Sequence, residues 1–133
     1  MSSEIWFAKA QRNLQSAKLL LAAGDTDSAC NRAYYSMFHA ARAALFSVGQ
    51  HERAMGKTHS GMIASFSEFL VKSKLLAPEN GRNLGLESNR RLLSDYEGDV
   101  LTNQDASASI ERADSFLAAV QAIIAHETNE QGS

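Results

Sequence analysis

The sequence predicts an all-α fold, an up-and-down bundle of four long helices with one shorter helix. Apolar residues recur at helical spacing along most of the chain, and proline occurs once among the 133 residues. No segment alternates apolar and polar residues as a half-buried strand does. The length suits one domain, which we place at residues 1–127, followed by a polar, frayed tail at residues 128–133.

The first helix is expected over residues 4–23. Its apolar residues stand three or four positions apart, as one helical face requires: Trp6, Ala10, Leu14, Ala17 and Leu21. Gly24 is expected to end this helix, because glycine is the commonest residue at a helix C-terminus. Asp25 or Asp27 is expected to cap the next helix.

The second helix, expected over residues 26–48 and ended by Gly49, carries three parallel stripes. The first is apolar, the second small and the third polar and aromatic. They consist of Tyr34, Phe38, Ala41 and Leu45; of Ala29, Ala33, Ser36 and Ala40; and of Arg32, Tyr35, His39 and Arg42. Most of this helix is therefore expected to face other groups, and little of it to be plain solvated surface.

The segment at residues 50–58 is polar and is predicted to be a loop. A third helix follows at residues 59–72, with Ile63, Phe66 and Leu70 as its core face. Leu75 and Leu76 are expected to fill the core from the connector that follows this helix.

The fourth helix is expected to begin near Pro78, because proline is favoured in a first helical turn, and to reach residue 96 or 97 before Gly98. The last helix begins near residue 104. Its expected cap is Thr102, Asn103 or Asp105. Its inner face consists of Ile110, Ala113, Leu117, Val120 and Ile124.

Composition limits the classes of function. The formal net charge is −2, so any contact with RNA must come from a local basic patch. The single cysteine, Cys30, cannot form an internal disulfide, which favours a reducing cytoplasm. No signal peptide and no apolar run of roughly 20 residues is evident, so no membrane span is expected. Histidine spacing predicts no zinc site, and no glycine-rich phosphate loop follows a strand, so we expect no metal and no cofactor.

Three segments resemble the HEPN family. Residues 29–43, Ala-Cys-Asn-Arg-Ala-Tyr-Tyr-Ser-Met-Phe-His-Ala-Ala-Arg-Ala, are similar to the second helix of HEPN domains. Residues 57–61, Lys-Thr-His-Ser-Gly, followed by Phe66, resemble a turn that is common in the family. Arg91 followed by Asp95 and Tyr96 is similar to the end of the family's fourth helix. The resemblance covers roughly residues 4–127.

The resemblance implies a helical bundle that forms a homodimer and accompanies a small nucleotidyltransferase as one half of a toxin–antitoxin pair. Catalytic HEPN members are metal-independent ribonucleases in which four to six residues separate an arginine from the histidine that follows it, usually on a late helix. The late helix of this chain has Asp95 near the place of that histidine. The spacing occurs instead between Arg32 and His39, and between Arg53 and His59.

The polar stripe suits phosphate chemistry. An arginine fork such as Arg32 binds a phosphate through two hydrogen bonds. A histidine such as His39 transfers protons near neutral pH. A tyrosine such as Tyr35 stacks on a base or donates to a phosphate oxygen. We therefore expect a groove of Arg32, Tyr35, His39, Arg91 and Tyr96 that binds nucleotide or RNA, with His59, Arg90 and Asp95 as further ligand-binding residues.

Two alternatives stay open. One is a metal-independent endoribonuclease that uses Arg32 and His39. The other is a non-catalytic, dimeric interaction module whose contact is the small-residue stripe. In that second case the same polar residues are structural. Tyr35 packs, Arg32 pairs with Asp95 or Glu97, His39 bonds a backbone carbonyl or Asp95, and His59 caps the third helix or stabilises its turn.

Overall fold

The computed structural model describes the backbone of residues 2–97 and 101–132, and the side chains of residues 2–92 and 101–127. All regular structure in these ranges is helical, which confirms the predicted fold class. In chain order the elements are α1 (Ser3–Ala22), α2 (Thr26–Ser47), α3 (His51–Ala54), α4 (His59–Phe66), the π-helix η1 (Ser67–Val71), α5 (Pro78–Glu97) and α6 (Asn103–Gly132).

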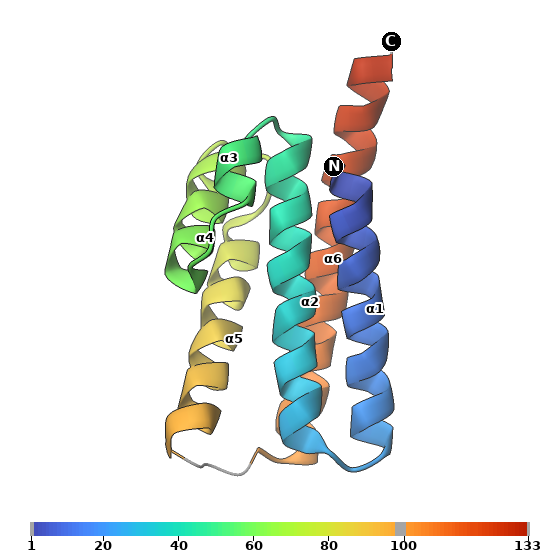
Figure 1. The fold of residues 1–133 in the computed structure, drawn as a ribbon, viewed down its shortest axis with the longest axis vertical. Helices are drawn as coiled ribbons and strands as arrows, with labels where there is room; N and C mark the ends of the chain where they lie inside the picture. The colour runs from blue at the N-terminus through green and yellow to red at the C-terminus, as the bar shows by residue number, and fades with distance from the viewer. Residues whose placement is uncertain (1, 98–100, 133) are drawn as a thin grey trace.

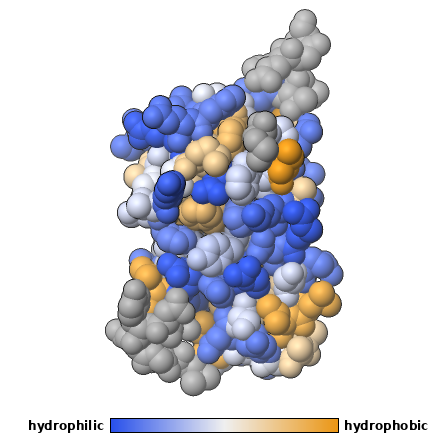
Figure 2. All heavy atoms as spheres, viewed as in Figure 1, coloured by the Kyte–Doolittle hydropathy of each residue, from blue (hydrophilic) through white to orange (hydrophobic). Residues whose placement is uncertain are grey.

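The four long helices run up and down along one axis (Figure 1). In this view α2 lies between α1 and α5, with α6 behind, and α3 and α4 lie beside the end of α2 that leads into them. Hydrophilic side chains cover most of the coloured surface on this face, and apolar ones form small separate patches (Figure 2). Among the described residues, no helix is long and apolar enough to cross a membrane.

Glycine ends both α1 and α2, as the sequence predicts. Gly24 and Gly49 each have φ of +85°, a left-handed conformation that other residues rarely adopt. After α1, the N–H of Gly24 donates to the carbonyl of Leu21, and the N–H of Asp25 donates to that of Leu20. Carbonyls of the last helical turn are thereby satisfied, and the chain reverses within a few residues.

Side chains satisfy free N–H groups at the helix starts. Asp25, rather than Asp27, caps α2, and its carboxylate accepts from the N–H of Ser28 at 3.3 Å. At α6 the pairing is reciprocal: Thr102 accepts from the N–H of Asp105, and Asp105 accepts from the N–H of Thr102. Asp27 instead accepts from the N–H of Leu101, which ties the start of α2 to the start of α6.

The small-residue stripe of α2 is used within the chain. Ala29, Ala33, Ser36 and Ala40 all have no exposed surface. Ala29 packs in a cluster with Cys30 and with Ala106 of α6. Short side chains let the neighbouring helices approach α2 closely, which buries the stripe. The prediction that this stripe forms the contact with a second copy is therefore wrong.

The region between α2 and α5 departs from the prediction in detail. Residues 50–58 are not all loop, because α3 forms one helical turn at His51–Ala54. The third helix begins at residue 59 as predicted, but it continues as the π-helix η1 after Phe66. On its inner side Met62 is fully buried, whereas Ile63 is only partly buried. Of the two connector leucines, Leu76 is buried and Leu75 is exposed.

The last helix is longer than its apolar pattern indicates. Its five predicted inner residues are all buried. The helix continues through residues 128–132, where the sequence predicts a tail. Pro78 stands at the start of α5 as predicted. The predicted stop at Gly98 lies outside the described residues.

Replacing Gly61 by alanine is expected to lower the free energy of unfolding by about 1 kcal/mol. Thr58 caps α4 by accepting from the N–H of Gly61 at 3.0 Å. A Cβ at Gly61 would lie 2.6 Å from the Thr58 Oγ1, so the hydroxyl would have to turn away from its capping position. Urea unfolding monitored by circular dichroism measures the loss. In a protein that already carries Thr58→Ala, Gly61→Ala should lower the free energy of unfolding much less. If Gly61→Ala costs as much there as in the wild type, the explanation is contradicted.

Candidate functional site

Side chains from four helices meet on the half-buried side of α2. They share positive charge or an aromatic ring. We call this set the α2 face: Trp6 and Lys9 of α1, Arg32, Tyr35, His39 and Arg42 of α2, His59 of α4 and Arg91 of α5. The structure thus brings together five of the sequence-predicted residues, namely Arg32, Tyr35, His39, His59 and Arg91, and adds Trp6, Lys9 and Arg42.

Cationic groups of this face lie over aromatic rings. The Cζ of Arg32 is 5.1 Å from the centre of the Tyr35 ring, and that of Arg91 is 6.0 Å from it. The Cζ of Arg42 is 4.6 Å from the centre of the Trp6 ring. Such contacts attract a cation to the electron-rich face of a ring. The rings therefore hold several positive charges near one another on one surface.

Two of these arginines have no acidic partner among the described side chains. Arg32 donates through Nη1 to the side-chain oxygen of Asn13 at 3.1 Å. Arg42 donates through Nε to the carbonyl of Ala54 at 2.7 Å and through Nη2 to that of Gly56 at 3.0 Å. These acceptors are neutral, so the positive charge of the face is not cancelled by them. The bonds of Arg42 also hold the turn that contains α3.

His39 is an uncharged member of the face at neutral pH. Its ring stacks on Trp6, with centroids 5.7 Å apart and planes at 20°. Burial of the ring and, to a smaller extent, neighbouring positive charges lower the pKa of His39 from 6.5 to about 4. Those charges belong to Lys9, Arg42 and Arg32. Among the described residues, neither Nδ1 of His39 nor Nε1 of Trp6 has a hydrogen-bond partner.

His59 joins α4 to α2. Its Nδ1 lies 2.6 Å from the hydroxyl of Tyr34, a fully buried side chain. Burial and the charge of Arg91 lower the pKa of His59. Thr58, and not His59, caps α4. His59 therefore forms part of the wall of the face and positions the turn that the sequence singled out.

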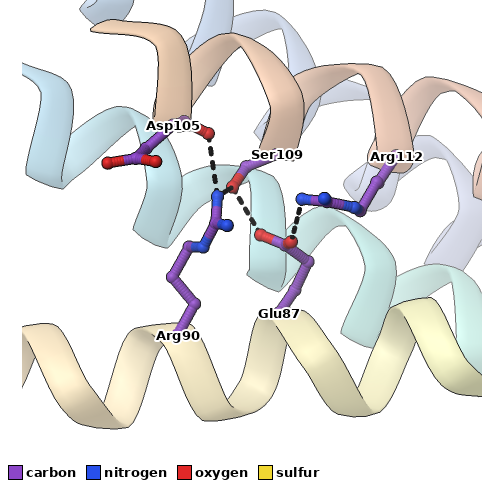
Figure 3. Close-up of polar contacts among 5 residues, drawn as sticks. All are labelled: Glu87, Arg90, Asp105, Ser109 and Arg112. Carbon is purple, nitrogen blue, oxygen red and sulfur yellow. Dashed lines mark hydrogen bonds and ion pairs between the residues drawn. The ribbon is translucent and has the colours of Figure 1, made fainter. Parts of the chain in front are cut away.

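The two adjacent arginines of α5 diverge. Consecutive helical residues point about 100° apart. Arg91 faces Tyr34 and Tyr35, whereas Arg90 reaches α6, where its Nη1 donates to the carbonyl of Asp105 at 3.0 Å and to the hydroxyl of Ser109 at 3.2 Å (Figure 3). The structure thus separates Arg90 from the α2 face. The side chains of two further predicted site residues, Asp95 and Tyr96, lie outside the described residues.

A buried polar network lies between α5 and α6. Glu87 is 2% exposed, and its carboxylate accepts from the hydroxyl of Ser109 and from Nη1 of Arg112, at 2.8 Å for the latter (Figure 3). Sequence reasoning missed this network. One signal was available, because Glu87 stands three residues after the buried Leu84 on the same helical face.

Among the described residues, no three histidine, cysteine, aspartate or glutamate side chains lie close enough together to hold a metal ion. A hollow of about 320 Å³ lies between α5 and α6, and its lining includes Asn83, Glu111 and Arg112. It is separate from the α2 face.

Comparison with known proteins settles the family. The model of the HEPN domain matches residues 3–123. The chain belongs to the HEPN family. The predicted resemblance to this family is thereby confirmed.

Named relatives come from bacteria and archaea. A UPF0332 protein of Gloeobacter violaceus is 32% identical over 111 residues, covering 82% of this chain and 85% of the relative. A UPF0332 protein of Thermotoga maritima is 31% identical over 123 residues, covering 91% and 89%. A protein of Methanocaldococcus jannaschii that bears the name "Putative toxin" is 32% identical over 108 residues, covering 81% and 78%.

Acid is expected to destabilise this HEPN protein partly through His39. The pKa of His39 is about 4 in the folded protein, whereas the ordinary value of 6.5 applies to the unfolded chain. Between pH 4 and pH 6.5 the unfolded chain therefore binds a proton that the folded protein does not. Stability present above pH 6.5 is therefore lost as the pH falls toward 4. Allowing for solvent screening of the partly buried ring, His39 accounts for roughly 1–2 kcal/mol of this loss.

Urea unfolding of the wild type and of His39→Gln at pH 7 and pH 4.5 measures this effect. Other titrating groups are common to both proteins, so the difference between the two acid losses isolates His39. The wild type should lose more stability than the variant. Equal losses would show that the folded protein accepts a proton at His39 without cost.

Proposed function

We propose that this HEPN protein binds nucleotide or RNA on its α2 face and acts as the HEPN member of a toxin–antitoxin or related stress or defence pair. The observation that supports the binding site is the concentration of positive charge around Arg32 and Arg42, without a described acidic partner, in a chain of net charge −2. The name of the Methanocaldococcus relative supports the toxin–antitoxin setting.

The chemistry of the face suits a phosphate group. Guanidinium groups form short, charge-assisted hydrogen bonds to phosphate oxygens. Arg32 is half-buried, and the attraction between charges is stronger near a protein surface than in bulk water. The proposed setting, carried over from the family resemblance, is a cytoplasmic homodimer that pairs with a small nucleotidyltransferase.

Binding is better supported than cleavage. A ribonuclease that used Arg32 and His39 would need His39 to give or take a proton near neutral pH. The pKa of about 4 leaves the ring uncharged there and makes it a weak base. The alternative of a ligand-free interaction module loses its predicted contact, because the small-residue stripe is buried within the chain.

The proposal is tested by binding of fluorescein-labelled single-stranded RNA and of ATP to the purified protein. Arg32→Ala should weaken binding about 10- to 100-fold, since a hydrogen bond to a charged group contributes about 1.5–3 kcal/mol. Arg82→Ala is the matched control, because Arg82 is exposed and lies nine residues before Arg91, on the opposite side of α5. Circular dichroism checks the folding of each variant.

The binding proposal is overturned if the wild type binds neither ligand at micromolar concentration. It is also overturned if the Arg32→Ala variant binds as well as the wild type. The same samples report on cleavage. RNA cutting by the wild type that disappears in a folded His39→Ala variant would favour the ribonuclease alternative. Co-purification with a co-expressed small nucleotidyltransferase tests the proposed partner separately.

A further inference from the structure

The aromatic rings of the α2 face are already covered by side chains of the protein itself. Lys9 and Arg42 lie over the Trp6 ring, with Nζ and Cζ at 5.2 and 4.6 Å from its centre. His39 stacks on the same indole. The second partly buried ring, that of Tyr35, has guanidinium groups at 5.1 and 6.0 Å from its centre. A nucleobase that stacked on either ring would have to displace a cation.

We propose that the α2 face recognises the phosphate groups of its ligand and does not recognise the base. This inference rests on the proposed function, in which the face binds nucleotide or RNA, and it names the part of the ligand that the face recognises. Base stacking contributes affinity only where a ring face is open to the base. Here stacking would first cost a cation–π contact of about 0.5–1 kcal/mol or more.

Phosphate binding has no such cost, because a guanidinium group that stacks by its flat face still presents its N–H groups at the edge. Each arginine has five N–H donors. Among the described residues, Arg32 uses one of them, on Asn13, and Arg42 uses two, on backbone carbonyls. Both arginines therefore keep donors for a ligand while their guanidinium groups stay over the rings. The rings act as supports for the arginines.

Asn13 is the positioning residue for Arg32. Its side-chain oxygen accepts from Nη1 of Arg32 at 3.1 Å, and its side-chain nitrogen donates to the backbone carbonyl of Lys9 at 2.9 Å. The amide is thus fixed to α1 and restrains the guanidinium group of Arg32 through one of its N–H groups. An arginine whose rotamer is already fixed loses less entropy when it binds.

Specificity follows from this arrangement. Affinity should depend on the charge of the phosphate and little on the base, so RNA binding should be independent of sequence and should weaken steeply with salt. A nucleoside, which has the base but no phosphate, should bind poorly. A sugar phosphate, which has no base, should bind about as well as the nucleotide.

Trp6 is the only tryptophan of the chain, so its fluorescence reports from within the face. The full-length protein is titrated at constant ionic strength with adenosine, adenosine monophosphate, ribose 5-phosphate and inorganic phosphate. Adenosine monophosphate and ribose 5-phosphate should bind within about threefold of each other, and adenosine at least about tenfold more weakly. Adenosine that binds as tightly as its monophosphate overturns the inference, as does ribose 5-phosphate that binds about tenfold more weakly than the monophosphate.

The outcomes separate this inference from the proposed function. Nucleotide that binds through its base overturns the inference and leaves the proposed function standing. If phosphate and sugar phosphate bind but RNA and nucleotides fail to bind, the proposed function is overturned and the phosphate site is supported. Absence of binding by every probe overturns both.

Variants of Asn13 test the positioning role. Asn13→Ala should weaken phosphate binding about threefold to tenfold. Asn13→Asp should weaken it more, because the carboxylate pairs with Arg32 and competes with the ligand. Thermal stability should follow a different order, with Asn13→Asp at least as stable as Asn13→Ala. Gln15→Ala, an exposed change on α1, is the control. An aspartate variant that binds phosphate as well as wild type overturns the role of Asn13.

Discussion

Replacing Arg112 by methionine is expected to lower the free energy of unfolding by about 3 kcal/mol. Glu87 has 1% of its side chain exposed and pairs with Arg112, whose side chain is 29% exposed. Removing the arginine leaves a buried carboxylate with only the hydroxyl of Ser109 as a described partner. Losing one member of a buried pair costs about 3–5 kcal/mol, and the partial exposure of Arg112 places this case at the lower end.

Urea unfolding of the wild type, of Arg112→Met and of the double variant with Glu87→Met measures this cost. The double variant should recover much of the lost stability, because replacing both members of a buried ion pair by apolar residues is often nearly neutral. A single variant that loses less than about 1 kcal/mol would show that the buried carboxylate does not depend on Arg112.

Replacing Tyr34 by alanine is expected to lower the free energy of unfolding by about 3–5 kcal/mol. The side chain is fully buried in the main core, and its ring is 5.4 Å from the Cζ of Arg91. Its hydroxyl lies 2.6 Å from Nδ1 of His59. Truncation therefore leaves a large cavity and removes one of the contacts that join α4 to α2.

Tyr34→Phe is the matched variant, because it keeps the ring and removes only the hydroxyl. It should lose about 1 kcal/mol, the contribution of one hydrogen bond, and should bind phosphate as wild type does, since the ring that supports Arg91 stays. Chemical denaturation of both variants at pH 7 measures the two costs. Equal costs for alanine and phenylalanine would contradict the packing argument.

Sequence reasoning identified the fold because the determinants of each long helix are local. Periodic apolar positions, Gly24 and Gly49 as stops, and Asp25 as a cap all act within a few residues of one another. The single turn of α3 escaped prediction because Arg42, a side chain of α2, donates to the carbonyl of Ala54 in α3 and to that of Gly56 just after it. No local pattern reveals such a tertiary contact.

The candidate site was predictable only in its α2 part. Arg32, Tyr35 and His39 share one helical face, which residue spacing reveals. Trp6 was placed in the core stripe of the first helix, yet it is half-buried and stacks on His39, because the packing of α1 on α2 decides which residues meet. The divergence of Arg90 and Arg91 likewise depends on where α6 lies relative to α5.

In the function we propose, this HEPN protein binds nucleotide or RNA on its α2 face. Backbone amide chemical-shift mapping by nuclear magnetic resonance, on adding adenosine monophosphate to the isotope-labelled protein, tests it most directly. We predict that the largest shifts cluster at Lys9, Asn13, Arg32, His39 and Arg91. Shifts confined to the hollow between α5 and α6, at Asn83 and Glu111, would contradict the claim and place the site on another surface.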